Sequence, residues 1–207
     1  SSGESDALER DYWIQLLKSI AALLGQSWRI DPLAMSPEMR EWAFNVRDRQ
    51  MADNLLWLAE RAYPKRKIIV WAATSHIIRR RDLVTNISDK IVPMGDWLDK
   101  TLGSEIYALG FCAYQGWWGT VEMALPAEVP AAEANSLEEL FLSAGFEYAF
   151  ADVRYLGSDG AWLRGPLLCR PMTYSPMIAD WTCLLDGIFF IRETSPSVRT
   201  GYYRLKD

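Results

Sequence analysis

The apolar stretch Lys67-Ile-Ile-Val-Trp-Ala-Ala73 decides the fold class of this 207-residue chain. Pro64 precedes it, and the polar segment Thr74-Ser75-His76 follows it directly. A continuous apolar run of this length predicts a strand buried on both faces, as in a parallel sheet. In open α/β sheets ligands bind beyond the carboxyl ends of such strands, so the stretch also predicts a ligand site at Ser75 and His76.

Segments on either side of this run alternate between helical and strand-like patterns, which predicts an α/β fold with a mostly parallel sheet flanked by helices. Three further apolar runs are predicted to be strands of the same sheet, over residues 106–113, 148–153 and 187–191. Helical spacing and capping residues predict helices over residues 7–25, 36–62, 93–102 and 136–145. Residues 124–135 are predicted to be a loop, and residues 157–185 to be irregular. The length favours a single domain over residues 1–207.

Composition and charge argue against several classes of protein. The formal net charge of -5, without a basic patch, argues against a nucleic-acid partner. No apolar stretch approaches the roughly 18 residues of a membrane span. The three cysteines (Cys112, Cys169 and Cys183) are too widely spaced for a CxxC pair or a disulfide framework, and they fit a reducing compartment. We therefore predict a cytoplasmic protein without a metal site or cofactor, and leave its oligomeric state open.

The long helix predicted over residues 36–62 carries an unusual mixed stripe. Arg47, Met51, Asn54 and Leu58 recur at helical spacing on one face, and Asp48 lies at its edge. Buried polar groups need partners, so two interpretations remain open. The stripe forms either an internal Arg–Asp network that holds the helix to the sheet, or the lining of a pocket.

His76 is the only histidine in the chain, which argues against a His-rich metal site. Imidazole titrates near neutral pH, so His76 is a candidate general base, although a lone histidine can equally be a hydrogen-bonded loop residue. Ser75 does not complete a serine triad, because no G-x-S-x-G segment is present. Trp117, in the segment Gly116-Trp117-Trp118-Gly119, either stacks on a ligand or packs beneath a glycine-hinged loop.

Five blocks of sequence carry a resemblance to a known family. They are Arg47-Asp48-x-x-Met51-Ala52-x-Asn54, Ile69-Val-Trp-Ala-Ala-Thr-Ser-His76, Pro93-Met94-Gly95, Tyr107-Ala-Leu-Gly-Phe111 and Asp186-Gly-Ile-Phe-Phe-Ile191. In these blocks the chain resembles the erythromycin esterase family, which includes succinoglycan-biosynthesis-like proteins. The resemblance extends from about residue 8 to residue 203.

The resemblance implies an erythromycin-esterase-like α/β core and a small-molecule ester as substrate, cleaved by water that a histidine activates. It implies that His76 and Arg47 act in catalysis. We expect four further residues to contact the substrate, namely Asp48, Asn54, Ser75 and Trp117.

Two departures from the family pattern qualify this expectation. The family's Trp-Ala-His-Asn-x-His segment has Ala73 in place of its first histidine, and no Gly-Glu-x-x-His-Gly segment is present to supply the principal base. We therefore expect either the C-terminal part of a longer family member or a reduced relative. The leading hypothesis is a hydrolase domain that contributes part of an ester-cleaving pocket but lacks the water-activating histidine. The alternative is a non-catalytic ligand-binding or interaction domain that kept the fold.

Overall fold

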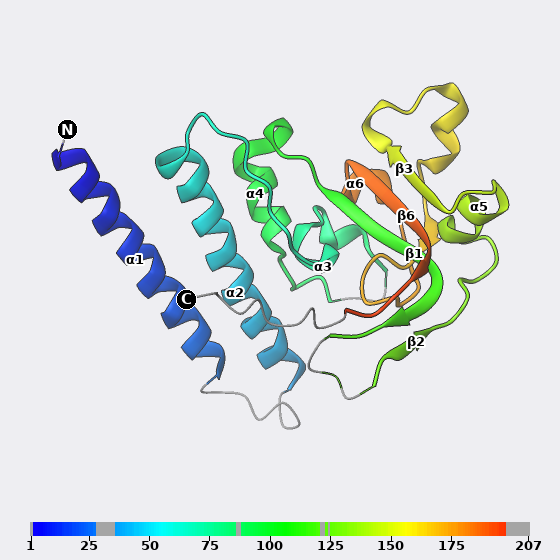
Figure 1. The fold of residues 1–207 in the computed structure, drawn as a ribbon, viewed down its shortest axis with the longest axis horizontal. Helices are drawn as coiled ribbons and strands as arrows, with labels where there is room; N and C mark the ends of the chain where they lie inside the picture. The colour runs from blue at the N-terminus through cyan, green and yellow to red at the C-terminus, as the bar shows by residue number, and fades with distance from the viewer. Residues whose placement is uncertain (1, 28–35, 86–87, 121–122, 124, 198–207) are drawn as a thin grey trace, which may run out of the picture.

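A computed structural model describes residues 2–27, 36–85, 88–120, 123 and 125–197 (Figure 1). The helices are α1 (Ser2–Ser27), α2 (Pro37–Trp57), α3 (Thr74–Ile77), α4 (Met94–Leu102), α5 (Leu137–Ser143) and α6 (Trp181–Leu184). The π-helical turn η1 (Leu58–Ala62) continues α2, and short 3-10 turns are η2 (Arg81–Leu83), η3 (Gly103–Glu105), η4 (Val153–Tyr155) and η5 (Ser158–Leu163). The strands are β1 (Leu109–Trp118), β2 (Ala127–Val129), β3 (Tyr148–Asp152), β4 (Leu167–Cys169), β5 (Met177–Ala179) and β6 (Gly187–Thr194).

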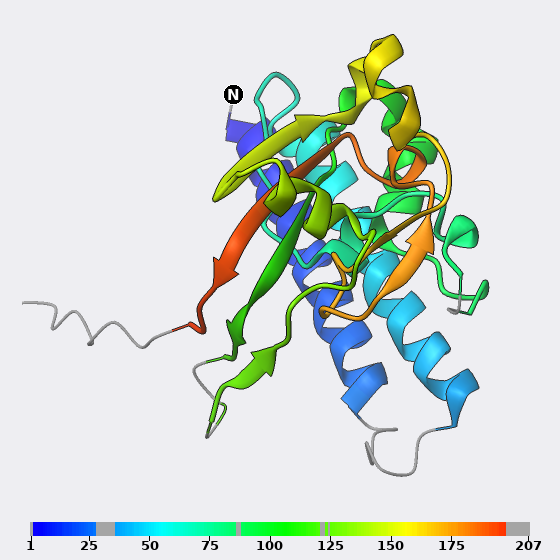
Figure 2. The ribbon, with the colours of Figure 1, turned by 90° about the vertical axis from the view of Figure 1, so that its right-hand side faces the viewer.

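The sheet is mixed, so the prediction of a mostly parallel sheet was wrong. Four strands lie in the order β2-β1-β6-β3, and a separate two-stranded sheet pairs β4 with β5. Only β1 and β6 run parallel, while β2 pairs antiparallel with β1 and β3 pairs antiparallel with β6. The short connection from β1 to β2 explains part of this result, because a hairpin joins antiparallel strands, whereas parallel strands need a long crossover. In Figure 2 these strands lie in front of α1 and α2.

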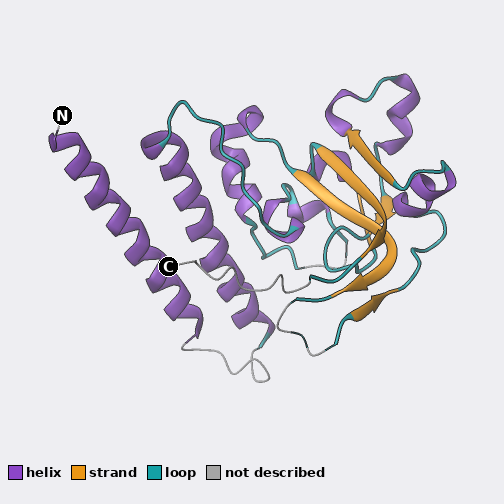
Figure 3. Ribbon diagram, in the orientation of Figure 1, coloured by secondary structure: helices purple, strands orange, loops and turns teal. Residues whose placement is uncertain are grey.

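Residues 67–73 do not form the predicted strand. They run as a coil from the end of η1 to α3 (Figure 3), and no backbone hydrogen bond between described residues involves residues 67–72. Ile69 is 93% exposed and Trp71 is 88% exposed, although the Trp71 ring contacts the ring of Phe111 on β1. An apolar run predicts a buried strand only where other residues cover it, and here the described residues leave it uncovered.

Capping chemistry predicted the starts of α2 and α5 and the end of α4, whereas α1 begins before and ends after the predicted range 7–25. The Ser36 hydroxyl accepts a hydrogen bond from the Met39 N–H at the start of α2, and the Ser136 hydroxyl accepts one from the Glu139 N–H at the start of α5. Gly103 ends α4 with a φ of 50°, a conformation that favours glycine. The predicted strands 106–113, 148–153 and 187–191 correspond to β1, β3 and β6 with shifted ends. The predicted loop 124–135 contains β2, and the region predicted as irregular contains β4, β5 and α6.

Two groups of buried apolar side chains hold the layers together. The larger one lies between the four-stranded sheet, α5, α6 and the β4–β5 pair, and includes Cys112, Trp181, Leu184 and Phe190. The smaller one joins α2 to α4 through Ala52, Met94 and Leu98. No described helix is long and apolar enough to cross a membrane.

Candidate functional site

Asp48 and His76 form a buried acid–imidazole pair. Asp48 lies in α2 with its side chain fully buried, and His76 lies in α3 with its side chain 15% exposed. Each carboxylate oxygen of Asp48 is 2.9 Å from His76 Nδ1. The backbone N–H of Met94, the first residue of α4, donates to Asp48 Oδ2 at 2.9 Å. The carboxylate is therefore held by two donors and lies at a helix N-terminus, where negative charge is favourable.

Arg47 completes the network on the solvent side. Its Nη2 lies 3.0 Å from His76 Nε2, its Nε lies 3.6 Å from Asp48 Oδ1, and its side chain is 46% exposed. Because a guanidinium can only donate, Nε2 must be the acceptor in this bond. That assignment places the ring proton of a neutral His76 on Nδ1, where it donates to Asp48. The nitrogen nearer solvent therefore carries the lone pair.

Phe44 supports the ring of His76 from one side. The two rings stack with their centroids 5.1 Å apart and their planes 18° apart. The Arg47 guanidinium also lies 5.5 Å from the centre of the Phe44 ring. Phe44, Arg47 and Asp48 stand at i, i+3 and i+4 in α2, so one helix face presents all three to α3.

Three contacts fix the short helix that carries His76. Arg79, just after α3, donates to Asp186 Oδ1 at 2.8 Å, and its backbone N–H donates to the carbonyl oxygen of Leu184 at 3.1 Å. Gly95 lets α4 approach α3 closely, because a Cβ at this position would lie 2.2 Å from the carbonyl oxygen of Ile77. The position of His76 therefore depends on the end of α6, on Asp186 just after it and on the start of α4.

The remaining predicted residues lie apart from this network. Asn54 donates to the Ser19 hydroxyl of α1 and accepts from Gln50, both at 2.9 Å, so its side chain faces α1 instead of His76. Our expectation that Asn54 shares one cleft with Arg47 and His76 is therefore not supported by its contacts. Ser75 is half-buried beside His76 in α3, and Trp117 is an exposed residue of β1 opposite Glu128 of β2.

Sequence reasoning missed two parts of the site, the Phe44 ring and the Met94 N–H. The i, i+3, i+4 spacing of Phe44 with Arg47 and Asp48 was a usable signal. The Met94 contact had no local signal, because it joins residues 46 positions apart. Asp48 was expected to contact substrate, whereas its observed partners are His76, Met94 and Arg47.

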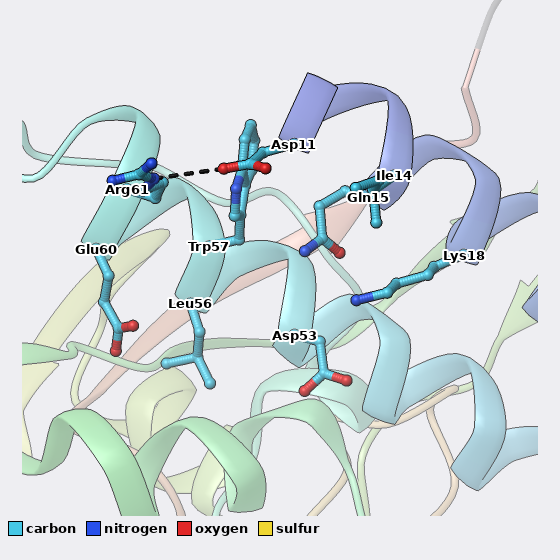
Figure 4. A pocket seen from close by; sticks show the side chains of 9 residues that line it. All are labelled: Asp11, Ile14, Gln15, Lys18, Asp53, Leu56, Trp57, Glu60 and Arg61. Atoms are coloured by element: carbon cyan, nitrogen blue, oxygen red, sulfur yellow. Dashed lines mark hydrogen bonds and ion pairs between the residues drawn. The ribbon is translucent and has the colours of Figure 1, made fainter. Parts of the chain in front are cut away.

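Two surface grooves lie along α1 and α2, and no predicted site residue lines either of them. The first has a volume of about 480 Å³ and is crossed by the ion pair between Arg61 and Asp11 (Figure 4). Its lining is strongly charged, with Lys18, Asp53 and Glu60 beside that pair. The Arg47–Asp48–His76 network is the better candidate site, because it brings an oriented imidazole and a half-exposed cation together.

This arrangement has a defined chemical capacity. Asp48 orients the imidazole and can stabilise the positive charge that the ring gains when Nε2 takes a proton, as the acid does in a hydrolase triad. Arg47 supplies a permanent positive charge beside that nitrogen. The network is suited to bind and polarise an oxygen that becomes negatively charged.

Comparisons with known proteins give a consistent picture. The family model for erythromycin esterase matches residues 5–194. The candidate hydrolase YbfO of Bacillus subtilis (strain 168) is 28% identical over 174 residues, which are 77% of this chain and 37% of that protein.

Solved structures share the fold at low sequence identity. A Bacillus cereus protein has a TM-score of 0.58 at 18% identity, covering 78% of this chain and 41% of its own. A succinoglycan biosynthesis protein has a TM-score of 0.58 at 19% identity, covering 73% and 38%. A mutant of the erythromycin esterase EreC in its open conformation has a TM-score of 0.53 at 17% identity, covering 72% and 37%. The chain thus spans about two fifths of the length of these relatives.

Proposed function

The chain belongs to the erythromycin esterase family, and from that premise we propose that it is a hydrolase domain that contributes part of an ester-cleaving pocket. The observation that carries the proposal is the series of contacts from buried Asp48 through His76 to half-exposed Arg47. The similarity to a candidate hydrolase and to an erythromycin esterase supports the reaction class.

In the proposed reaction, Arg47 and His76 hold the carbonyl oxygen of the ester. Attack by water on the carbonyl carbon places negative charge on that oxygen, and donors aimed at it lower the barrier. When His76 Nε2 takes a proton, it changes from acceptor to donor and can no longer accept from Arg47. Both groups then donate to the incoming oxygen, while Asp48 stabilises the charged ring.

Water activation is not assigned to this network. His76 Nε2 takes its proton from solvent before the attack. The water then loses a proton to a base outside the network, the departing alkoxide takes one from His76 Nε2, and the base returns its proton to solvent, so the products are an acid and an alcohol. By the resemblance, that base is the histidine of a Gly-Glu-x-x-His-Gly segment, which is not among these 207 residues. The proposal therefore gives this chain substrate binding and carbonyl polarisation.

A phosphonate monoester tests the proposal, because its tetrahedral anion mimics the intermediate of ester hydrolysis. Binding of phenyl methylphosphonate is measured by calorimetry and by the ¹⁵N shifts of the His76 ring. We expect Arg47→Ala and His76→Ala each to weaken binding by about tenfold or more, since each removes a charge-assisted hydrogen bond.

Arg49→Ala is the matched control. Arg49 lies on the same helix but pairs with Asp53, its Nε being 2.9 Å from Asp53 Oδ1. Binding should be unchanged in this variant. Equal losses in the Arg47 and Arg49 variants, or no binding by the unaltered chain, would contradict the proposal.

The rival function is a non-catalytic ligand-binding domain, and one observation favours it. Arg47 occupies the His76 Nε2 lone pair in this structure, so the ring is not free to act as a base on its own. The two functions differ in what the intact reading frame should contain. An upstream Gly-Glu-x-x-His-Gly segment favours the hydrolase, and a start codon close to Ser1 favours the rival.

A further inference from the structure

Three metal-ligating side chains meet in the larger apolar core. Cys112 comes from β1, Glu138 from α5 and Cys169 from β4. One donor atom of each lies within 4.8 Å of the other two. Their exposed fractions are 2%, 0% and 1%, and neither cysteine is in a disulfide. None of these residues belongs to the Arg47–Asp48–His76 network.

Glu138 is only partly satisfied by the protein. Its Oε1 accepts from the Arg170 N–H at 2.8 Å and from the Cys169 thiol at 3.3 Å. Its Oε2 is buried and has no hydrogen-bond partner among the described residues. Burying a carboxylate oxygen without a partner costs folding free energy. A cation or a hydrogen-bond donor bound to this oxygen would remove that cost.

We propose that Cys112, Cys169 and Glu138 form a structural site for a borderline-soft divalent cation, for which Zn²⁺ is the best match. Two thiolates and one carboxylate supply three ligands of the types that zinc takes in proteins. Thiolates select zinc over the hard cations Mg²⁺ and Ca²⁺.

The charge of the surroundings suits such a site. Two thiolates and a carboxylate carry one more negative charge than a divalent cation neutralises. Arg170 follows Cys169 directly and donates its backbone N–H to Glu138 Oε1, and its buried guanidinium donates to the carbonyl oxygens of Ala113, Tyr114 and Pro130. Without a metal, burial raises the pKa of the Cys169 thiol well above its ordinary value, and neighbouring Cys112 and Glu138 raise it further. Cation binding would displace the thiol protons.

The site would hold the small β4–β5 sheet to the rest of the domain. It links three elements, β1, α5 and β4, through side chains that are buried. The burial of all three ligands closes the site to a substrate. The function inferred is therefore stabilisation of the fold.

The first test is the metal content of the purified 207-residue chain, prepared without chelators and measured by inductively coupled plasma mass spectrometry. We expect about one zinc ion per chain. Cys112→Ser, Cys169→Ser and Glu138→Gln should each reduce the zinc content to background. Cys183→Ser is the matched control, because Cys183 is an exposed cysteine outside the cluster, and it should retain the metal.

A second measurement avoids variants that fail to fold. The unaltered chain is unfolded with a chelator and refolded with Zn²⁺, Co²⁺ or Mg²⁺. Zinc and cobalt should raise the Tm and magnesium should not, and the cobalt form should show thiolate-to-metal charge-transfer absorption. The proposal is overturned by a metal-free purified chain whose Tm does not respond to zinc, or by a disulfide between Cys112 and Cys169 in mass spectrometry.

Discussion

Asp48 is the residue on which the candidate site depends. Its fully buried carboxylate accepts from the side chain of His76 and from the backbone of Met94, and so joins α2, α3 and α4 at one point. The same contacts orient the imidazole. A single residue thus joins three helices and orients His76.

We predict that Asp48→Ala lowers the free energy of unfolding by about 2–5 kcal/mol, because two buried donors each lose their acceptor. Urea denaturation measures this change. Asp53→Ala is the control, since Asp53 is a 39% exposed partner of Arg49 on the same helix, and its loss should cost at most about 0.5 kcal/mol. Equal losses in the two variants would show that the Asp48 contacts contribute little.

Sequence reasoning identified Arg47 and His76 as neighbours in space but missed what holds them. Helical spacing on α2 placed Arg47 and Asp48 side by side. His76 was placed by the carboxyl end of a strand over residues 67–73 that does not form, so that reason for its position was wrong. Asn54 was assigned to the same face, yet α1 packs there and takes its side chain through Ser19. The pairing of two distant helices had no signal in the spacing of residues on either one.

At the scale of elements, the start of α4 fixes the geometry between α2 and α3. Met94 reaches Asp48, and Gly95 touches the carbonyl oxygens of Ile77 and Ile78. A side chain at position 95 would push α4 away from both neighbours. Gly95 therefore allows the close packing that positions α3 and its His76, although it carries no functional group.

We predict that Gly95→Ala destabilises the protein by about 3 kcal/mol, at the upper end for overpacking, because its Cβ would meet backbone atoms 2.2 and 2.4 Å away. Thermal unfolding measures the loss, and the His76 Nδ1 proton signal should shift with it. Gly157→Ala is the control, since nothing lies within 4 Å of its added Cβ and its φ is -67°. A stable Gly95→Ala variant would refute the close packing described.

Element prediction succeeded where the signal was local and failed where it depended on distant partners. Ser36 and Ser136 cap helices by accepting hydrogen bonds from residues three positions later, so the local sequence was sufficient to predict where these helices begin. The 67–73 stretch has the apolar composition of a buried strand, but none of the described residues packs over it to bury it. β4 and β5 are three-residue strands, too short to show a period.

At the scale of the whole molecule, the chain spans about two fifths of the length of its relatives. By our proposal it supplies only part of the pocket. We predict that the 207-residue chain hydrolyses neither macrolide lactones nor activated esters above background. General-base catalysis typically raises the rate of a reaction by about 10²–10⁴-fold, and the proposed base is not in the network. His76→Ala is assayed in parallel: robust turnover that disappears in this variant would make His76 the base.

The uncovered 67–71 stretch predicts how the chain behaves at high concentration. Extended apolar segments with unpaired backbone groups promote association between molecules. We expect Ile69→Lys and Trp71→Lys to reduce self-association measured by sedimentation velocity, without lowering the Tm. Leu125→Lys is the control, since Leu125 is 79% exposed outside this stretch. Unchanged sedimentation in all three variants would assign association to another surface.

The same coil also determines where a protease should cut. Lys65 and Arg66 are exposed just before it and Lys67 is exposed at its start, and trypsin cleaves after such residues in extended, exposed chain. We expect limited trypsin digestion to nick the chain there first, with mass spectrometry locating the cut. One break would leave Asp48 and His76 on separate fragments, held together only by non-covalent contacts. A nicked protein that still elutes as one species would therefore show directly how strongly α2 binds the remainder of the fold.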